Sequence, residues 1–95
     1  MGKYRFLPVA LTDLEQAIQW YGARSETTAA RFATEVERVL AEIESSPSRF
    51  PLWDKIHRFA LLKRFPYFIA FRDIGDSPLI VAVRHTSRNT TSFES

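Results

Sequence analysis

The chain contains no cysteine, only three glycines among 95 residues, and no apolar run of transmembrane length. Without cysteine, neither a disulfide nor a thiolate-bound metal site can form, and a reducing cytoplasm suits the protein. The few glycines make no glycine-rich phosphate loop, and no spacing of His, Asp and Glu predicts a metal site. The N-terminal M-G-K-Y-R-F lacks the apolar region of a signal peptide. We therefore expect a cytoplasmic protein with no metal, no cofactor and no membrane contact.

Apolar residues are plentiful, with 45% hydrophobic and 14% aromatic side chains. This composition predicts a packed globule rather than a disordered chain. A chain of this size buries about 60–65% of its unfolded surface, which is enough for one modest core. We expect a single domain over residues 1–95, in which residues 87–95 form a short polar tail.

Charge is distributed unevenly along the sequence. Residues 1–46 carry five basic and seven acidic side chains, a net charge of −2, whereas residues 47–95 carry eight and four, a net charge of +4. Mild asymmetry of this kind is common on a solvated surface. The alternative is a basic working face that binds phosphate or an acidic protein.

Local signals divide the N-terminal half into a strand and two helices. Apolar and polar residues alternate over Lys3–Leu7, which predicts a short strand. Pro8 suits the first turn of a helix, because its missing N–H would be unpaired there, and Gly22 ends that helix. Ser25 is a favourable N-cap for a second helix, which the polar run from Ser45 ends.

The C-terminal half predicts three strands, at about residues 58–64, 66–72 and 79–86. The order is therefore β-α-α-β-β-β. Only a few residues join the two helices, so they should form an antiparallel hairpin. We expect an α+β fold in which this hairpin covers one face of an antiparallel sheet.

Strict alternation in the last two strands leaves apolar side chains on both faces of the sheet. One face receives Leu79, Val81, Val83 and His85, and the other receives Ile80, Ala82 and Arg84. The face without helices would thus keep apolar surface, which in a small domain indicates a partner. Both strands end in arginine, so the sheet is basic where its strands end.

Several segments, in order, resemble one toxin family. They are Y-R-F-L-P-V-A-L-T-D-L-E near the start, V-L-A-E-I-E-S-S-P at the end of the second helix, F-P-Y-F-I-A-F-R, and V-A-V-R-H-T-S-R. Together, over roughly residues 3–88, they resemble the RelE/ParE superfamily of toxins from bacterial toxin–antitoxin pairs. The P-Y-x-I-x-F and H-x-x-R segments are most similar to the ParE-like and plasmid-stabilisation branch.

This resemblance implies a cytoplasmic toxin that a cognate antitoxin neutralises in a hetero-oligomer. ParE-like members poison DNA gyrase, and this function is the one we expect. RelE-like members instead cut mRNA on the ribosome, and a nuclease of that kind is the first alternative. A further alternative is a binding module that has the same fold but is not toxic.

A nuclease would need a base, an acid and cations around the phosphate. Some RelE-like toxins use an aromatic hydroxyl near the C-terminus, but the aromatic residue here is Phe93, which has no hydroxyl. For that alternative only, we predict His85 as the proton-transfer group, with Arg84 or Arg88 on the phosphate. The simpler interpretation of His85 is a strand-end side chain that hydrogen-bonds a loop carbonyl.

The remaining basic residues could form a surface for nucleic acid or for an acidic antitoxin. The candidates are Arg49, Lys55, Arg58, Lys63, Arg64 and Arg72. For any one of them, ordinary solvated charge is the simpler interpretation. We interpret Trp53 as a lid over the core in preference to a platform for stacking bases.

Overall fold

The computed structural model describes residues 4–75 and 77–87. Along the chain lie β1 (Arg5–Phe6), α1 (Pro8–Gly22), α2 (Glu26–Ser45), the 3-10 helix η1 (Pro47–Arg49), β2 (Arg58–Leu61), β3 (Tyr67–Asp73) and β4 (Pro78–His85). This arrangement confirms the predicted β-α-α-β-β-β order and the α+β class. Lys3 and the predicted tail from residue 88 lie outside the described residues.

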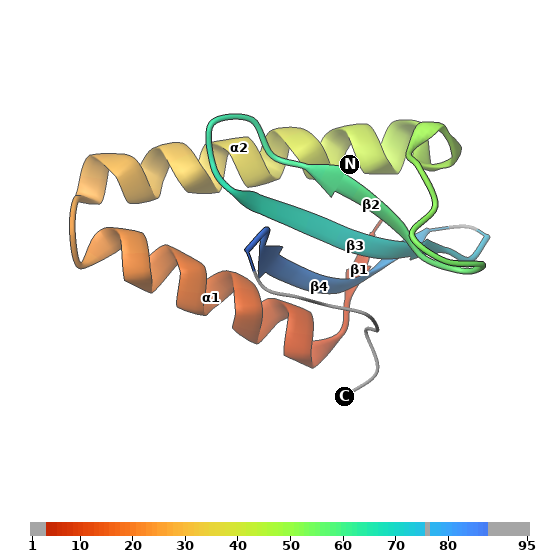
Figure 1. Cartoon of the computed structure of the whole chain (residues 1–95), viewed down its shortest axis with the longest axis horizontal. Helices are drawn as coiled ribbons and strands as arrows, with labels where there is room; N and C mark the ends of the chain where they lie inside the picture. The colour runs from red at the N-terminus through yellow and green to blue at the C-terminus, as the bar shows by residue number, and fades with distance from the viewer. Residues whose placement is uncertain (1–3, 76, 88–95) are drawn as a thin grey trace.

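The helix ends follow the local signals. Pro8 is the first residue of α1, and Leu7 before it has the extended backbone that a residue preceding proline favours. Gly22 is the last residue of α1. The Ser25 hydroxyl accepts the Thr28 N–H at 3.1 Å and caps α2. These caps fix a short turn between the helices, so α1 and α2 run side by side in opposite directions (Figure 1).

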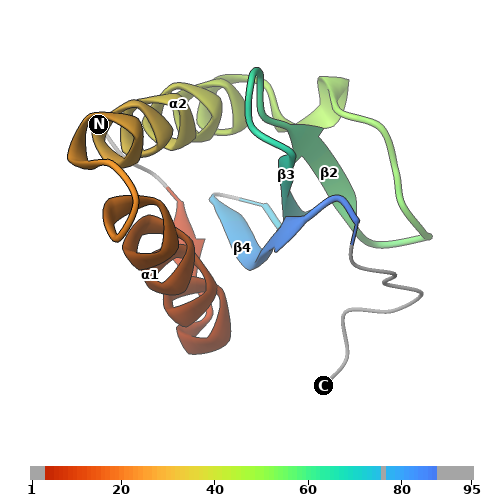
Figure 2. The ribbon, with the colours of Figure 1, turned by 60° about the vertical axis from the view of Figure 1, so that its left-hand side comes forward.

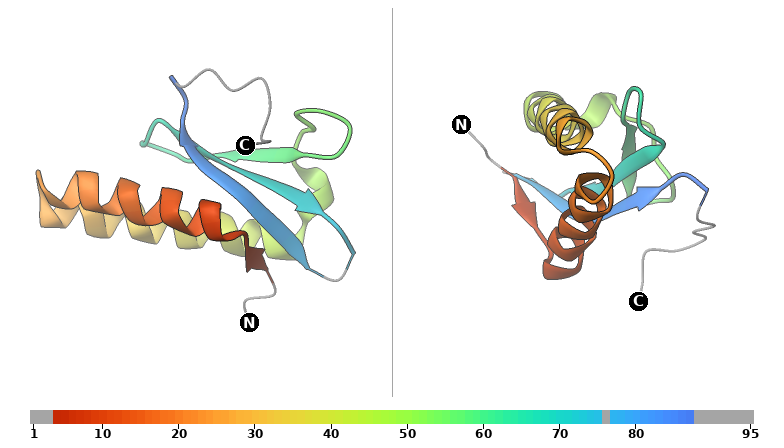
Figure 3. Two further views of the ribbon diagram at one scale, coloured as in Figure 1. Left: turned by 90° about the horizontal axis from the view of Figure 1, so that it is seen from below. Right: turned by 90° about the vertical axis from the view of Figure 1, so that its left-hand side faces the viewer.

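Four strands form one sheet in the order β1-β4-β3-β2. Strands β2, β3 and β4 are antiparallel, as predicted, whereas β1 pairs with β4 in parallel. Two helices and two strands separate β1 from β4 in the chain, so no tight hairpin forces them to be antiparallel. The helical hairpin lies on one side of this sheet (Figures 2 and 3).

The main core lies between the hairpin and the sheet. Its fully buried large side chains are Phe32, Val39 and Ile43 from α2, Ile69 and Phe71 from β3, and Ile80 from β4. Val36 and Leu40 belong to the same cluster, and Leu14 and Ile18 of α1 pack against it. Both helices therefore pack apolar side chains against the sheet, as expected for a hairpin that covers one sheet face.

A β-bulge in β4 changes which side chains share a face. Ala70 pairs with Ala82, but Phe71 pairs with Ile80, so Val81 is an extra residue without an opposite partner. Ile80 and Val83 consequently both join the helix-side core, and Val81 and Ala82 both join a second cluster. The strict alternation predicted for this strand is therefore wrong across Val81.

The second cluster occupies the face of the sheet that lies away from the helices, here called the outer face. Its buried members are Phe68, Ala70, Val81 and Ala82. Trp53, from the link between η1 and β2, stacks on Phe68 with ring centroids 5.4 Å apart and meets the edge of Phe59. Trp53 is thus a lid, but over this second cluster rather than over the main core. No described helix covers the outer face (Figure 2).

The position of Leu40 allows a direct test of the helix phase. Leu40 is 4% exposed in the main core, so Leu40→Asp would bury a charge without a partner. We expect the free energy of unfolding to fall by about 3–5 kcal/mol. Denaturant unfolding followed by circular dichroism measures the change. Ala41→Asp, on the exposed side of the same helix, is the matched control, and equal stability of the two variants would contradict this packing.

Candidate functional site

The candidate basic residues of the link region occupy different environments. Arg58 is part-buried, and its Nη1 donates to the carbonyl of Phe50 at 2.6 Å, which ties β2 to the end of η1. Arg49 is exposed, with its Nη2 4.0 Å from the carboxylate of Glu42. Lys55 is exposed in the link. Arg58 therefore supports the fold, and Arg49 and Lys55 remain surface cations.

A carboxylate organises the link that carries Trp53. Asp54 Oδ1 accepts the backbone N–H groups of Ile56 and His57 at 2.8 and 2.7 Å, and Oδ2 lies 2.9 Å from His57 Nδ1. The hydrogen bond from the His57 ring, together with these backbone donors, lowers the pKa of Asp54 to about 2. Leu52 and Ile56, both in this link, are each 53% exposed.

Arg72 and Arg84 lie at opposite ends of the outer face. Arg72 pairs across the sheet with Leu79, and Arg84 with Phe68, and both of those partners belong to the outer cluster. The Nε of Arg72 is buried and has no hydrogen-bond partner among the described residues. The outer face is therefore apolar at its centre, with an arginine near each end.

His85, at the end of β4, contacts Ser87 and Tyr67. Its Nδ1 accepts the Ser87 N–H at 3.1 Å and lies 2.8 Å from the Ser87 hydroxyl. A backbone N–H can only donate, so Nδ1 is the acceptor and a neutral ring carries its proton on Nε2. The ring meets Tyr67 edge-on at 5.2 Å. The His85 Nδ1 thus contacts the N–H and the hydroxyl of Ser87, whereas the simpler interpretation expected a loop carbonyl.

A cavity of about 200 Å³ lies beside His85. Its lining is Asp13, Gln16, Ala17, Trp20, Tyr67, Val83, Arg84 and His85. Asp13 Oδ2 accepts the Val83 N–H at 3.2 Å, because β1 pairs with β4 only as far as Ile80 and leaves this edge of β4 without a strand among the described residues. The fold thus brings Arg84 and His85 to one cavity, while Arg88, the third predicted residue, lies outside the described residues.

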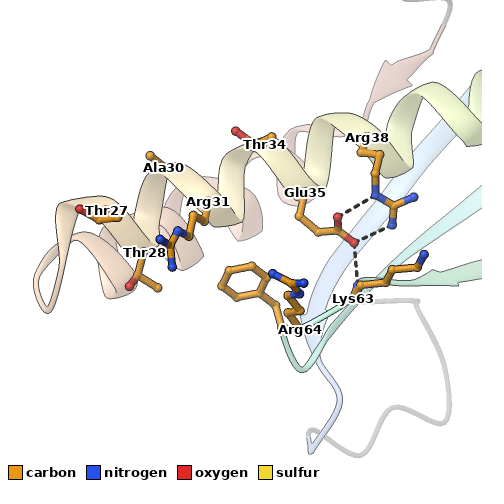
Figure 4. A pocket seen from close by; sticks show the side chains of 10 residues that line it. Thr27, Thr28, Ala30, Arg31, Thr34, Glu35, Arg38, Lys63 and Arg64 are labelled. Carbon is orange, nitrogen blue, oxygen red and sulfur yellow. Dashed lines mark hydrogen bonds and ion pairs between the residues drawn. The ribbon is translucent and has the colours of Figure 1, made fainter.

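A larger cleft of about 810 Å³ separates α2 from the turn between β2 and β3 (Figure 4). It contains two residues that the sequence predicted, Lys63 and Arg64, and two that it did not, Arg31 and Arg38. The full lining is Thr27, Thr28, Ala30, Arg31, Thr34, Glu35, Arg38, Lys63, Arg64 and Phe65. The spacing of residues 27, 31, 34 and 38 marks one polar stripe of α2, and this is the signal that could have revealed it.

Glu35 fastens the two walls of this cleft together. Its Oε2 accepts the Lys63 N–H at 2.6 Å, and its two oxygens accept a fork from Arg38 at 2.7 and 2.8 Å. Arg38 also donates to Glu42 at 2.8 Å. The Arg38 hydrogen bonds lower the pKa of Glu35, with the Lys63 N–H adding to the effect, and Glu35 in turn raises the pKa of Arg38. The cleft therefore has a fixed geometry around an ionised carboxylate whose charge Arg38 balances.

Two kinds of feature are absent from the part of the chain that the structure describes. Over residues 4–75 and 77–87, no group of three or more His, Asp or Glu side chains could hold a metal ion. Neither helix in those ranges is long and apolar enough to cross a membrane.

A family model described as the ParE toxin of the type II toxin–antitoxin system parDE matches residues 4–90. The chain belongs to the ParE toxin family. Among solved structures, the chromosomal ParDE toxin–antitoxin system from P. aeruginosa is similar, with a TM-score of 0.76 and 17% sequence identity over 90% of this chain and 96% of that one. At this identity the likeness shows a shared fold. No curated protein matched the sequence.

Glu35 gives this ParE-family toxin a predicted dependence on pH. Its pKa in the folded state lies below the ordinary value of 4.5, so its contribution to stability is present above about pH 4.5 and is lost as the pH falls through the folded pKa. Glu35→Gln should lower the free energy of unfolding at pH 7 by about 1–3 kcal/mol, because it removes a charged hydrogen-bond acceptor.

Denaturant titrations at pH 7 and pH 3 test this prediction. The difference in unfolding free energy between the two pH values should be smaller for Glu35→Gln than for the wild type. Glu37→Gln, an exposed residue of the same helix, is the control and should behave as the wild type does. Equal pH dependence of Glu35→Gln and the wild type would contradict the role assigned to Glu35.

Proposed function

We propose that this toxin inhibits growth by binding and poisoning DNA gyrase, and that a cognate antitoxin neutralises it. Membership of the ParE family supports a toxin of this kind. The observation that favours gyrase over mRNA is the state of His85, whose Nδ1 is engaged by Ser87. A toxin that acts by binding needs no free base at this position.

The chemistry of RNA cleavage makes the argument explicit. Attack by a 2′-hydroxyl needs a base for its proton, an acid for the leaving oxygen and a cation for the phosphate. In the cavity beside His85 the nitrogen that could accept a proton already holds the Ser87 N–H. The one carboxylate among the described lining residues, Asp13, accepts the Val83 N–H. These engaged groups support binding over bond cleavage, and the ribosome-dependent nuclease is the outcome to test against.

His85→Ala separates the two mechanisms. If the toxin binds gyrase, the change removes at most one contact and should alter potency by less than about tenfold. If the toxin cuts mRNA, loss of a general base should reduce cleavage by about 10²–10⁴. Induced expression in bacteria, scoring growth, the DNA damage response and mRNA cuts, distinguishes the two.

Lys55→Ala replaces an exposed residue of the link and is the control for expression and folding. We expect both variants to arrest growth with a DNA damage response and without cleavage of mRNA at the ribosome. Cuts made by the wild type that vanish in His85→Ala, but not in Lys55→Ala, would reject the gyrase proposal in favour of the nuclease.

The outer face is the surface that we assign to the antitoxin. Leu61 of β2 lies opposite Phe68 of the outer cluster and is 61% exposed, and Leu52 and Ile56 in the neighbouring link are each 53% exposed. Burial of such side chains supplies most of the free energy of a stable interface. An amphipathic antitoxin segment with acidic flanks would place apolar side chains on this centre and carboxylates near Arg72 and Arg84.

Leu61→Glu tests this surface. The side chain is 61% exposed, so the change should leave the toxin folded while placing a charge in the interface. We expect the dissociation constant of the toxin–antitoxin complex to rise by at least about tenfold, or 1.4 kcal/mol. Isothermal titration calorimetry with the antitoxin encoded beside the toxin gene measures it. Thr12→Glu, an exposed change on α1, is the control, and equal affinity of the two variants would exclude the outer face.

A further inference from the structure

The cleft between α2 and the β2–β3 turn carries an excess of positive charge that the proposed antitoxin surface does not use. Its lining holds Arg31, Arg38, Lys63 and Arg64 against a single carboxylate, Glu35. Arg38 is the cation that neutralises Glu35 through the forked hydrogen bonds. The other three cations therefore set the charge that an incoming group would meet.

Arg31 and Arg64 are the two cations best placed to bind such a group. Arg31 extends from α2 into the space in front of the turn, and Arg64 lies across that space (Figure 4). Neither guanidinium has a hydrogen bond or an ion pair to any residue in the ranges 4–75 and 77–87. Both forks of donors are thus available to a ligand.

The backbone at Arg64 adds an independent observation. Its φ is +70°, in the left-handed region, which costs a residue with a side chain roughly 1–2 kcal/mol relative to the right-handed region. Glycine would avoid this cost at the same place in the turn. The hydrogen bond from the Lys63 N–H to Glu35 holds the turn in this conformation. The strained backbone therefore fixes the direction of the Arg64 side chain.

We propose that this cleft binds an acidic protein segment whose carboxylates are held by Arg31 and Arg64. Planar guanidinium groups pair with carboxylates through two parallel hydrogen bonds, which suits two arginines on facing walls. The rest of the lining, with Ala30, Phe65 and threonines, offers apolar and hydroxyl contacts to a peptide. We assign this acidic segment to DNA gyrase, and that assignment rests on the proposed function.

A nucleic acid fits the cleft less well than a peptide. Proteins that hold nucleic acid by its backbone make several phosphate contacts, often about 6–10, whereas this chain has a net charge of only +2. Glu35 in the lining and Glu42 behind Arg38 would also repel phosphates.

The cleft lies at α2, and the outer face lies on the side of the sheet away from the helices. Target and antitoxin would therefore contact different surfaces.

The test uses the purified, full-length toxin with three probes: DNA gyrase, a ten-residue polyglutamate peptide, and single-stranded DNA of equal charge. The variant Arg31→Gln with Arg64→Gly removes both cations, and its second change also relieves the backbone strain, so the protein should remain folded. Lys55→Gln removes an exposed cation of the link and is the control. Thermal melting confirms that each variant is folded.

We expect the double variant to bind gyrase and the peptide at least about tenfold more weakly than the wild type, and Lys55→Gln to bind within about twofold. If the double variant binds both as the wild type does, the cleft is not the site, while the gyrase proposal stands. If the wild type binds the peptide through these arginines but does not bind gyrase, the acidic-segment site stands and the gyrase proposal fails. Arginine-dependent binding of DNA in preference to the peptide would overturn the inference.

Discussion

The sheet has two apolar faces, and the described chain supplies helices for only one of them. Burial of apolar surface stabilises a fold by about 25 cal/mol per Å². The packing of α1 and α2 buries the helix-side face, whereas the outer face has only the link around Trp53 to cover it. The link around Trp53 stacks on Phe68 and Phe59 and covers part of it. Leu61 at the end of β2 stays 61% exposed. A fold with this imbalance favours a partner, which accords with the proposal that this toxin acts and is controlled by binding.

The β-bulge at Val81 adds apolar side chains to the outer face of the sheet. It places Val81 and Ala82 together in the outer cluster while Val83 returns to the main core. Beyond the bulge Asp13 satisfies the Val83 N–H, and Ser87 engages His85. The groups at this end that could move protons therefore have structural partners. Arg31 and Arg64, whose guanidinium groups have no partner among the described residues, lie elsewhere, in the cleft formed by α2 and the β2–β3 turn.

Much of the fold could be predicted because its signals are local. Pro8, Gly22 and Ser25 mark helix ends through their own backbone chemistry, and the apolar stripe of α2 follows from helical spacing. The parallel pairing of β1 with β4 could not be predicted from the sequence. The bulge could not be predicted either, since neither a glycine nor a proline marks Val81. Both features depend on contacts between distant strands.

The candidate sites were predicted less well for the same reason. Lys63 and Arg64 were identified as basic residues, but the cleft exists because the Lys63 N–H bonds Glu35, which is 28 residues away in the chain. Arg31 was not among the sequence candidates, and it lies opposite the turn only because of that contact. His85 was a candidate from the sequence, but its Ser87 contact follows from the turn after β4, which strand alternation does not describe.

The central claim is that the outer face of the sheet is the surface on which this toxin is controlled. Hydrogen–deuterium exchange of the toxin, alone and bound to its antitoxin, tests it most directly. We predict slower exchange in the complex over residues 52–61, which include the Trp53 link and β2. Slower exchange confined to α1 and α2, with residues 52–61 unchanged, would contradict the claim.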